Sequence, residues 1–137
     1  MKTAVRYVSR GGNTEKIAHA IAKAIGTAAK SVDTPLSGPV DMLFLGGAIY
    51  AGKPDKRLAV FVRTLTKDAV KRIVVFSTSA DGKPLLPKLK ALLEERGITV
   101  SDETFACAGK FLFANREKPS ETDCEEAAQF AKKLTAR

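Results

Sequence analysis

Short apolar segments alternate with longer amphipathic segments along the whole chain, and this alternation limits the folds that the chain can adopt. Residues 42–45 and 73–76 are continuously apolar, as expected for strands buried on both faces of a sheet. The expected strands are residues 4–8, 28–32, 42–45, 73–76 and one segment within 98–108, and the expected helices are residues 14–25, 55–65, 85–96 and one that follows the capping sequence 120–123. This order predicts an α/β fold in three layers, a sandwich with helices on both faces of a five-stranded parallel sheet.

The composition is that of a globular chain that forms one domain over residues 1–137. No apolar run approaches the roughly 20 residues that span a bilayer, and Arg6 interrupts what would be the core of a signal peptide. Cys107 and Cys124 form no CxxC pair, and with His19 as the single histidine they cannot build a standard zinc site. We therefore expect no metal site and a cytoplasmic protein with reduced thiols.

The segment from Ser9 to Thr14 joins the first expected strand to the first expected helix. Its two glycines allow a sharp turn and a close approach of backbone N–H groups to an anion, and the helix start adds unpaired donors. The pattern predicts a phosphate site. It lacks both the P-loop sequence and the three spaced glycines of a dinucleotide fingerprint. A phosphoacceptor receiver domain is disfavoured, because the first strand ends in Tyr7-Val8-Ser9 without acidic residues.

Three motifs together resemble the flavodoxin family. Residues 9–14, Ser-Arg-Gly-Gly-Asn-Thr, resemble its phosphate loop, Ser/Thr-x-Thr-Gly-Asn-Thr, except that Gly11 replaces a threonine and removes one hydroxyl. Residues 41–52 resemble its third strand and flavin loop, and residues 107–111 with 119–123 resemble the end of short bacterial members. The resemblance implies the flavodoxin strand order 2-1-3-4-5, with FMN at the carboxyl ends of the strands.

The resemblance also implies which residues bind FMN. Tyr50 matches an aromatic residue that lies against the isoalloxazine ring, whereas the segment 77–83 has no aromatic residue and is expected to leave one ring face open. The expected phosphate ligands are Ser9, Arg10, Gly11, Gly12, Asn13 and Thr14, and the expected ring contacts from the loops 46–54 and 77–83 are Ala48, Ile49, Tyr50, Ala51, Gly52, Thr78, Ser79, Ala80, Asp81 and Gly82. We expect the charge of Arg10 to lie beside the phosphate and to offset the hydroxyl lost at Gly11.

The leading interpretation is an FMN-binding electron carrier in which the cofactor performs the chemistry and no side chain acts as an acid, a base or a nucleophile. Two alternatives stay open. An FMN-dependent oxidoreductase would act on its own substrate, of quinone or protoporphyrinogen type, although no long inserted loop is present to bind a macrocycle. A basic interaction module would use the same fold without a flavin.

The net charge of +8 differs from the acidic charge typical of flavodoxins. The basic residues expected around the ligand end of the sheet are Arg10, Lys53, Lys56, Arg57, Lys83, Lys110, Arg116 and Lys118, offset in part by Asp55, Asp81 and Glu117. Such a rim predicts a redox partner protein with an acidic docking surface, or an anionic small substrate. The scattered charges and the lack of interleaved aromatic residues argue against a nucleic-acid site.

Overall fold

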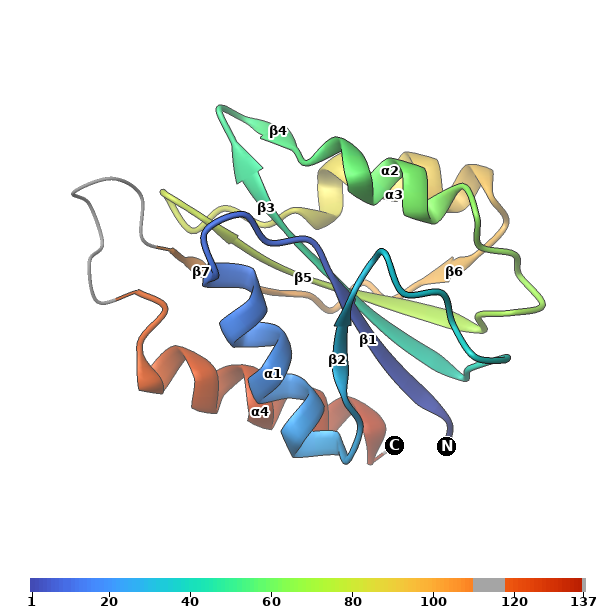
Figure 1. The fold of residues 1–137 in the computed structure, drawn as a ribbon, viewed down its shortest axis with the longest axis horizontal. Coiled ribbons are helices and arrows are strands. Elements are labelled where there is room, and N and C mark those ends of the chain that lie inside the picture. The colour runs from blue at the N-terminus through green and yellow to red at the C-terminus, as the bar shows by residue number, and fades with distance from the viewer. Residues whose placement is uncertain (110–117, 137) are drawn as a thin grey trace.

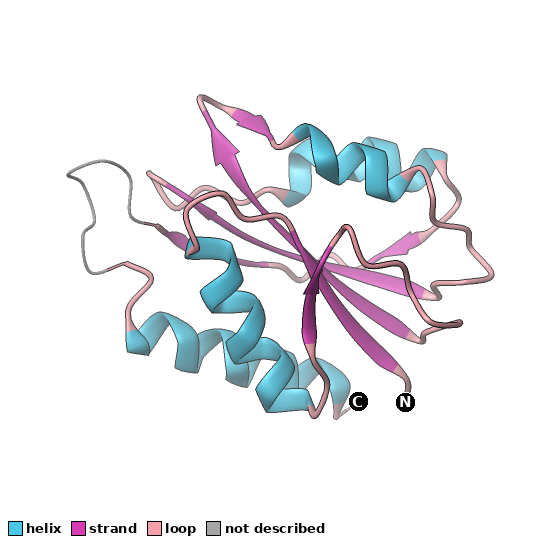
Figure 2. Cartoon of the chain, in the orientation of Figure 1, coloured by secondary structure: helices cyan, strands magenta, loops and turns pink. Residues whose placement is uncertain are grey.

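The computed structural model describes residues 1–109 and 118–136, which form a sheet between two layers of helices (Figure 1, Figure 2). The strands are β1 (Thr3–Tyr7), β2 (Ala29–Ser31), β3 (Met42–Tyr50), β4 (Lys53–Pro54), β5 (Arg72–Ser79), β6 (Thr99–Val100) and β7 (Phe105–Ala108). The helices are α1 (Asn13–Ile25), α2 (Lys56–Val62), α3 (Leu86–Glu95) and α4 (Glu121–Thr135). None of these helices has the length and apolar character of a membrane-spanning segment.

The order of the parallel strands confirms the expected order 2-1-3-4-5. Within the described residues the sheet runs β2-β1-β3-β5, and β6 and β7 share the last position beside β5. β6 pairs with the beginning of β5, at Arg72 and Ile73, whereas β7 pairs with its end, from Phe76 to Ser79. The fifth strand is therefore interrupted at residues 101–104, where the polar sequence predicts an irregular segment.

Alternating side chains of the central strands build two apolar cores, one on each face of the sheet. Leu45 and Val75 belong to the core covered by α2 and α3. Phe44 and Phe76 belong to the core covered by α1 and α4. Figure 1 shows these two helix pairs on opposite sides of the strands. Because both faces are covered, the central parts of β3 and β5 are apolar without interruption.

β3 and β5 extend further than the sequence predicts. Residues 46–50 and 77–79 are strand instead of loop, because they pair with each other and with their neighbours from Gly46–Phe76 to Ile49–Ser79. Hydrogen bonds between segments distant in the sequence thus extend both strands beyond their strongly apolar parts. The expected flavin contacts at positions 48–50 and 78–79 consequently lie on strands, so their assignment to loops is wrong.

After β3 the chain turns back in a hairpin, where the sequence predicts only the loop 46–54. β4 pairs antiparallel with the end of β3, with Tyr50 opposite Lys53. The two turn residues, Ala51 and Gly52, have φ angles of 51° and 76°, and positive values at both positions are typical of a two-residue hairpin turn. The hairpin leads directly into α2, whose N-cap is Asp55.

Gly46 and Gly47 allow both helix layers to pack closely against β3. A Cβ atom on Gly46 would lie 2.1 Å from Cε2 of Phe76, and a Cβ atom on Gly47 would lie 2.4 Å from Cδ1 of Leu58. Phe76 and Leu58 belong to the two opposite cores. Each glycine therefore provides the space that a large apolar side chain fills on one face of the sheet.

We expect Gly46→Ala to lower the free energy of unfolding by about 1–3 kcal/mol, because the new methyl group displaces the buried ring of Phe76. Gly11→Ala is a matched control, since a Cβ atom at Gly11 would meet no atom within 4 Å. The control is expected to change stability by less than about 1 kcal/mol. Urea unfolding of the apo-proteins measures both values, and equal losses in the two variants would contradict the packing argument.

Candidate functional site

The turn from β1 to α1 forms an open cradle of backbone N–H groups. Gly12 is the N-cap of α1 with a φ angle of 91°, and its N–H donates to Ser9 Oγ over 3.0 Å. No side chain in the described part of the chain caps this helix, whereas Asp55 caps α2 and Ser120 caps α4. The first turn of α1 thus offers its N–H groups and the positive end of its dipole to an anion at residues 9–14.

Two glycines border this cradle, and each has a different neighbourhood. Gly11 is exposed, and the space around its missing side chain is empty to 4 Å. Gly109, which follows β7, lies so close to Asn13 that a Cβ atom would be 2.7 Å from Asn13 Nδ2. The end of β7 is therefore beside the phosphate loop, which brings the first and third sequence motifs together.

Thr14 connects the start of α1 to the sheet. Its side chain is fully buried, and its Oγ1 lies 2.8 Å from Oγ1 of Thr78 on β5. Thr78 was expected to contact the flavin, but only 1% of it is exposed. The hydroxyls of these two expected ligands are therefore bonded to each other beneath the loop, and they tie it to the central strand β5.

The ends of β3 and β5 enclose a cleft of about 550 Å³, which is within the range of small-ligand sites. The residues that line it are Ile49, Tyr50, Ala51, Gly52, Ser79, Ala80, Asp81, Lys83 and Lys88. Three expected ring contacts, Ala48, Thr78 and Gly82, are not among these residues, and Ala48 and Thr78 are buried within their strands. The structure thus brings most of the two predicted flavin segments to one hollow.

A carboxylate shapes the turn at the far side of this cleft. Asp81 Oδ1 accepts hydrogen bonds from Ser79 Oγ over 3.0 Å and from the Lys83 N–H over 3.1 Å. The Lys83 ammonium lies 3.7 Å from Asp81 Oδ2. These donors, the Lys83 N–H most of all, lower the pKa of Asp81. Asp81 therefore stabilises the turn as an ionised carboxylate and is not suited to donate a proton at neutral pH.

Arg10 contacts the hairpin that follows β3 and the residue that caps α2. Its Nε donates to Asp55 Oδ2 over 3.0 Å, and its guanidinium carbon lies 4.5 Å from the centroid of the Tyr50 ring. This geometry is a cation–π contact. In this structure Asp55 therefore shares the charge of Arg10, and the role of Arg10 beside the phosphate, in place of the hydroxyl lost at Gly11, stays a prediction. The hairpin explains the pairing, because it returns Asp55 to the β1–α1 turn.

Asp55, expected only as an acid that offsets the basic rim, is a buried residue that pairs with two arginines. Its side chain is 3% exposed, and its oxygens accept from Arg10, from the Arg57 side chain and from the Arg57 N–H. The hydrogen bond from the Arg57 side chain is the largest of the effects that lower the pKa of Asp55 to about 2. An Asp at the start of a helix predicts an N-cap, but its pairing with Arg10 depends on tertiary structure.

The beginning of α4 confirms the expected capping box. Ser120 Oγ accepts from the Asp123 N–H, and the Asp123 carboxylate accepts from the Ser120 N–H. Lys118 is expected in the basic rim, but its Nζ lies 3.3 Å from Asp123 Oδ2 and forms an ion pair with this capping residue. Lys110 and Arg116 of the expected rim lie outside the described residues.

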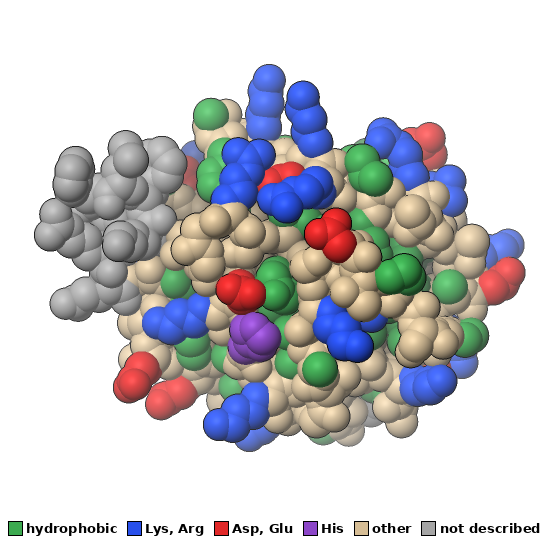
Figure 3. Space-filling model, in the orientation of Figure 1, with side chains coloured by type: hydrophobic (Ala, Val, Ile, Leu, Met, Phe, Trp, Pro, Cys, Tyr) green, Lys and Arg blue, Asp and Glu red, His purple; other side chains and the backbone are tan. Residues whose placement is uncertain are grey.

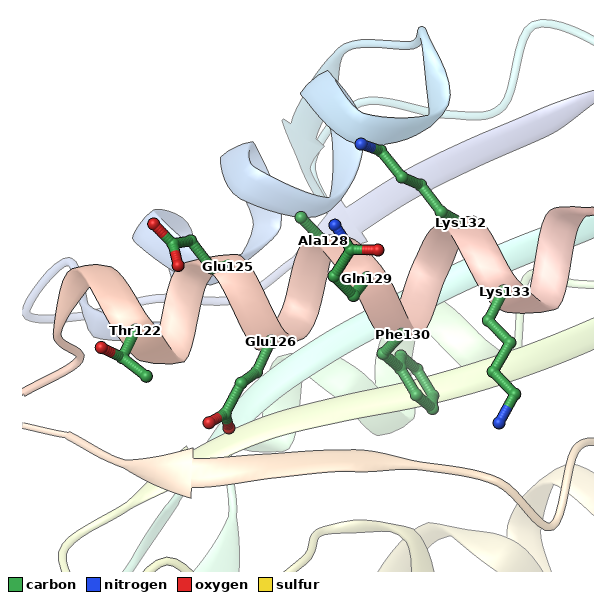
Figure 4. A pocket seen from close by; sticks show the side chains of 8 residues that line it. All are labelled: Thr122, Glu125, Glu126, Ala128, Gln129, Phe130, Lys132 and Lys133. Atoms are coloured by element: carbon green, nitrogen blue, oxygen red, sulfur yellow. The ribbon is translucent and has the colours of Figure 1, made fainter.

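A larger hollow of about 740 Å³ lies on α4. It is lined by Thr122, Glu125, Glu126, Ala128, Gln129, Phe130, Lys132 and Lys133, all from one helix. Figure 4 shows these side chains pointing to both sides of α4 instead of converging on a common point. Thr122 is the one lining residue of this hollow that belongs to the three motifs, so we assign the ligand site to the cleft between β3 and β5.

Comparison with known proteins identifies the family to which this fold and its loops belong. Residues 4–137 match the family model of the flavodoxin domain. The chain belongs to the flavodoxin family. A search of curated proteins finds no match.

Several solved flavodoxin structures share this fold. A flavodoxin from the domain Archaea superposes with a TM-score of 0.76 at 21% identity, covering 99% of this chain and 97% of that one. Oxidised Flavodoxin 2 from Bacillus cereus has a TM-score of 0.72 at 19% identity, with 99% of both chains covered. Rubredoxin oxygen:oxidoreductase from Desulfovibrio gigas has a TM-score of 0.71 at 14% identity, covering 98% of this chain but 35% of that protein. Family membership implies a flavin cofactor.

We expect Asp55→Asn to lower the free energy of unfolding by about 2 kcal/mol at pH 7, since Asn keeps the helix cap but loses the charge that both arginines need. Folding lowers the pKa of Asp55 from 3.8 to about 2, so the stabilisation is complete above about pH 4 and disappears as the pH falls toward 2. Urea unfolding from pH 7 to pH 3 should show the difference between wild type and variant shrinking. A difference that does not change with pH would contradict this account.

Proposed function

We propose that this flavodoxin binds FMN and carries electrons, with the phosphate on residues 9–14 and the isoalloxazine ring in the cleft between β3 and β5. One observation carries the proposal. Two segments distant in the sequence, 49–52 and 79–81, line one cleft of about 550 Å³ at the carboxyl ends of the strands. Arg10 links this cleft to the phosphate cradle through its contact with Tyr50.

The cradle fits a phosphate group. The start of α1 lacks a side-chain cap in the described residues, and the Ser9 hydroxyl accepts from Gly12, which leaves its own hydrogen to donate. Backbone N–H groups of residues 10–14 would hold the phosphate, and the buried Thr14–Thr78 bond would keep the loop in place. The nearby guanidinium of Arg10 is neutralised in part by Asp55, so its charge would act on the phosphate less strongly than an unpaired arginine.

The cleft fits a flat aromatic ring. Tyr50 is the one aromatic side chain among the described residues that line it, and Arg10, which stacks on Tyr50, is not among the lining residues. The isoalloxazine ring can therefore occupy the cleft while Arg10 keeps its contact with Tyr50. The bound flavin would supply the electron chemistry, while Tyr50 would orient the ring and the turn 79–82 would border its edge.

A carrier is favoured over an enzyme because, within the described residues, no histidine and no unpaired carboxylate lines the cleft. Asp81 is engaged by Ser79 and Lys83, and the remaining charged lining residue is Lys88. An FMN-dependent oxidoreductase is the alternative, since among the described residues a single aromatic side chain lines the cleft and a second ring face would be left to a substrate. The cytoplasmic location stays a prediction from cysteine usage.

Titration of the apo-protein with FMN tests the proposal. We expect one FMN per chain, with quenched flavin fluorescence and a yellow protein. Failure to bind FMN would overturn the proposal and favour the flavin-free module. Turnover of NAD(P)H or a quinone by the purified protein alone, without a separate reductase, would favour the oxidoreductase.

Gly11→Thr is expected to tighten FMN binding about three- to tenfold, because it adds one hydroxyl donor to the phosphate cradle. The site has room for the larger side chain, since nothing lies within 4 Å of a Cβ atom at Gly11. Gly11→Val is the matched control: it has nearly the same shape without the hydroxyl and should leave the dissociation constant unchanged. Equal affinities for the Thr and Val variants would show that residue 11 does not contact the phosphate.

A further inference from the structure

A buried acid organises exposed arginines at the edge of the cleft. Arg10 Nε and Arg57 Nη2 bond to the same Asp55 oxygen, over 3.0 and 3.1 Å. The Asp55 side chain is 3% exposed, whereas the side chains of Arg10 and Arg57 are 59% and 50% exposed. The solvent-facing side of this cluster is therefore positive, because the negative charge lies beneath the two arginines.

Lysines extend this positive surface around the cleft. Lys53 and Lys56 are exposed, and neither has an ion-pair partner within residues 1–109 and 118–136. Lys83 and Lys88 line the opposite side of the cleft, where Asp81 pairs with Lys83. We define the basic surface as Arg10, Lys53, Lys56, Arg57, Lys83 and Lys88. Figure 3 shows Lys and Arg side chains gathered where Figure 1 places β4 and the start of α2.

The basic surface carries a local charge of about +3, since its six cations are opposed among the described neighbours by Asp55, by Asp81 and, beside Arg57, by Asp33. This excess is concentrated beside the cleft, and the cation of Arg10 contacts Tyr50, which lines it. A partner that exchanges electrons with a group in the cleft must approach this edge. A clustered charge of one sign steers a partner of opposite sign and selects against partners of the same sign.

We propose that the basic surface docks an acidic patch on a redox partner protein, with the edge of the cleft facing that partner. The electron-transfer part of this inference rests on the proposed function, whereas the docking part rests on the charges alone. A protein patch suits the surface better than a nucleic acid, because the cations surround a hollow with one described aromatic side chain, Tyr50, whereas successive bases stack on several aromatic side chains.

A labelled oligoglutamate peptide tests docking without a flavin. We expect it to bind the apo-protein with an affinity that falls as salt rises, and we expect Lys53→Glu/Lys56→Glu to weaken binding at least about tenfold at low salt. The control is Lys132→Glu/Lys133→Glu, which makes the same change of net charge on α4. Leu134, next to this pair, lines a hollow with Met1 and Met42 at the amino ends of the strands, remote from the cleft.

Each outcome of this binding experiment decides the docking proposal. Loss of affinity in the Lys53/Lys56 variant with little change in the control supports it. Equal losses in both variants overturn it, because net charge alone would then explain the binding. No binding by the wild type also overturns it, because the basic surface would then not recognise an acidic chain. Tighter binding of a labelled DNA duplex than of the peptide, lost in the Lys53/Lys56 variant, would also overturn it and assign the surface to nucleic acid. Circular dichroism of each variant confirms that it is folded.

Small redox reagents test whether the charge acts at the cleft. Two equivalents of ferricyanide, a trianion, or of hexaammineruthenium(III), a trication, oxidise one protein that carries two-electron-reduced, anionic FMN. Each equivalent takes one electron, and the flavin releases one proton to the buffer. We expect the ferricyanide rate to fall with salt and the ruthenium rate to rise. In the Lys53/Lys56 variant the ferricyanide rate should drop about tenfold relative to the control variant.

Salt dependences of the opposite sign would overturn the docking proposal even if FMN binds. If FMN does not bind, the proposed function fails, and the peptide experiment still decides whether the basic surface recognises an acidic partner.

Discussion

The long pairing between β3 and β5 is the constraint on which the rest of the structure depends. It continues from Leu43–Ile73 to Ile49–Ser79 in the centre of the sheet. Gly46 and Gly47 allow it, because they let Phe76 and Leu58 cover β3 from both faces. Since the two strands end at the same level, the segments that follow them leave the sheet together and share one cleft.

The phosphate loop is held to this centre by contacts between segments far apart in the sequence. Thr14 bonds to Thr78 on β5, and Asn13 lies against Gly109 after β7. Arg10 reaches Asp55 beyond the hairpin. A loop fixed at several points loses less conformational freedom when it binds a ligand. The local sequence of residues 9–14 therefore supplies the donors, while the sheet order supplies their rigidity.

The sequence predicts the fold well because the information for it is local and repeated. Apolar runs and helical periodicity identify the central strands and the four helices, and right-handed crossovers leave few arrangements of a parallel sheet. The ends of β3 and β5 are not predictable in this way, because residues 46–50 and 77–79 become strand through pairing with a distant partner.

The candidate site shows the same division between local and distant information. Residues 49–52 and 79–81 do lie at one cleft, as the resemblance to flavodoxins implies. The partner of Arg10 could not be read from its neighbours, since Asp55 is 45 residues away and reaches it through the hairpin. Arg6 is a further case: it appears only as a charge in an apolar segment, yet it is buried and donates to the carbonyls of Val5, Thr34 and Pro35.

The shared carboxylate of Asp55 also has an entropic consequence. A free arginine side chain loses rotamer freedom worth up to about 2 kcal/mol when it is immobilised at an interface. Arg10 is already held by Asp55 and by the ring of Tyr50, and Arg57 is held by two Asp55 oxygens and the start of α2. Folding has therefore ordered these two cations before any partner arrives, whereas Lys53 and Lys56 would be ordered only in the encounter.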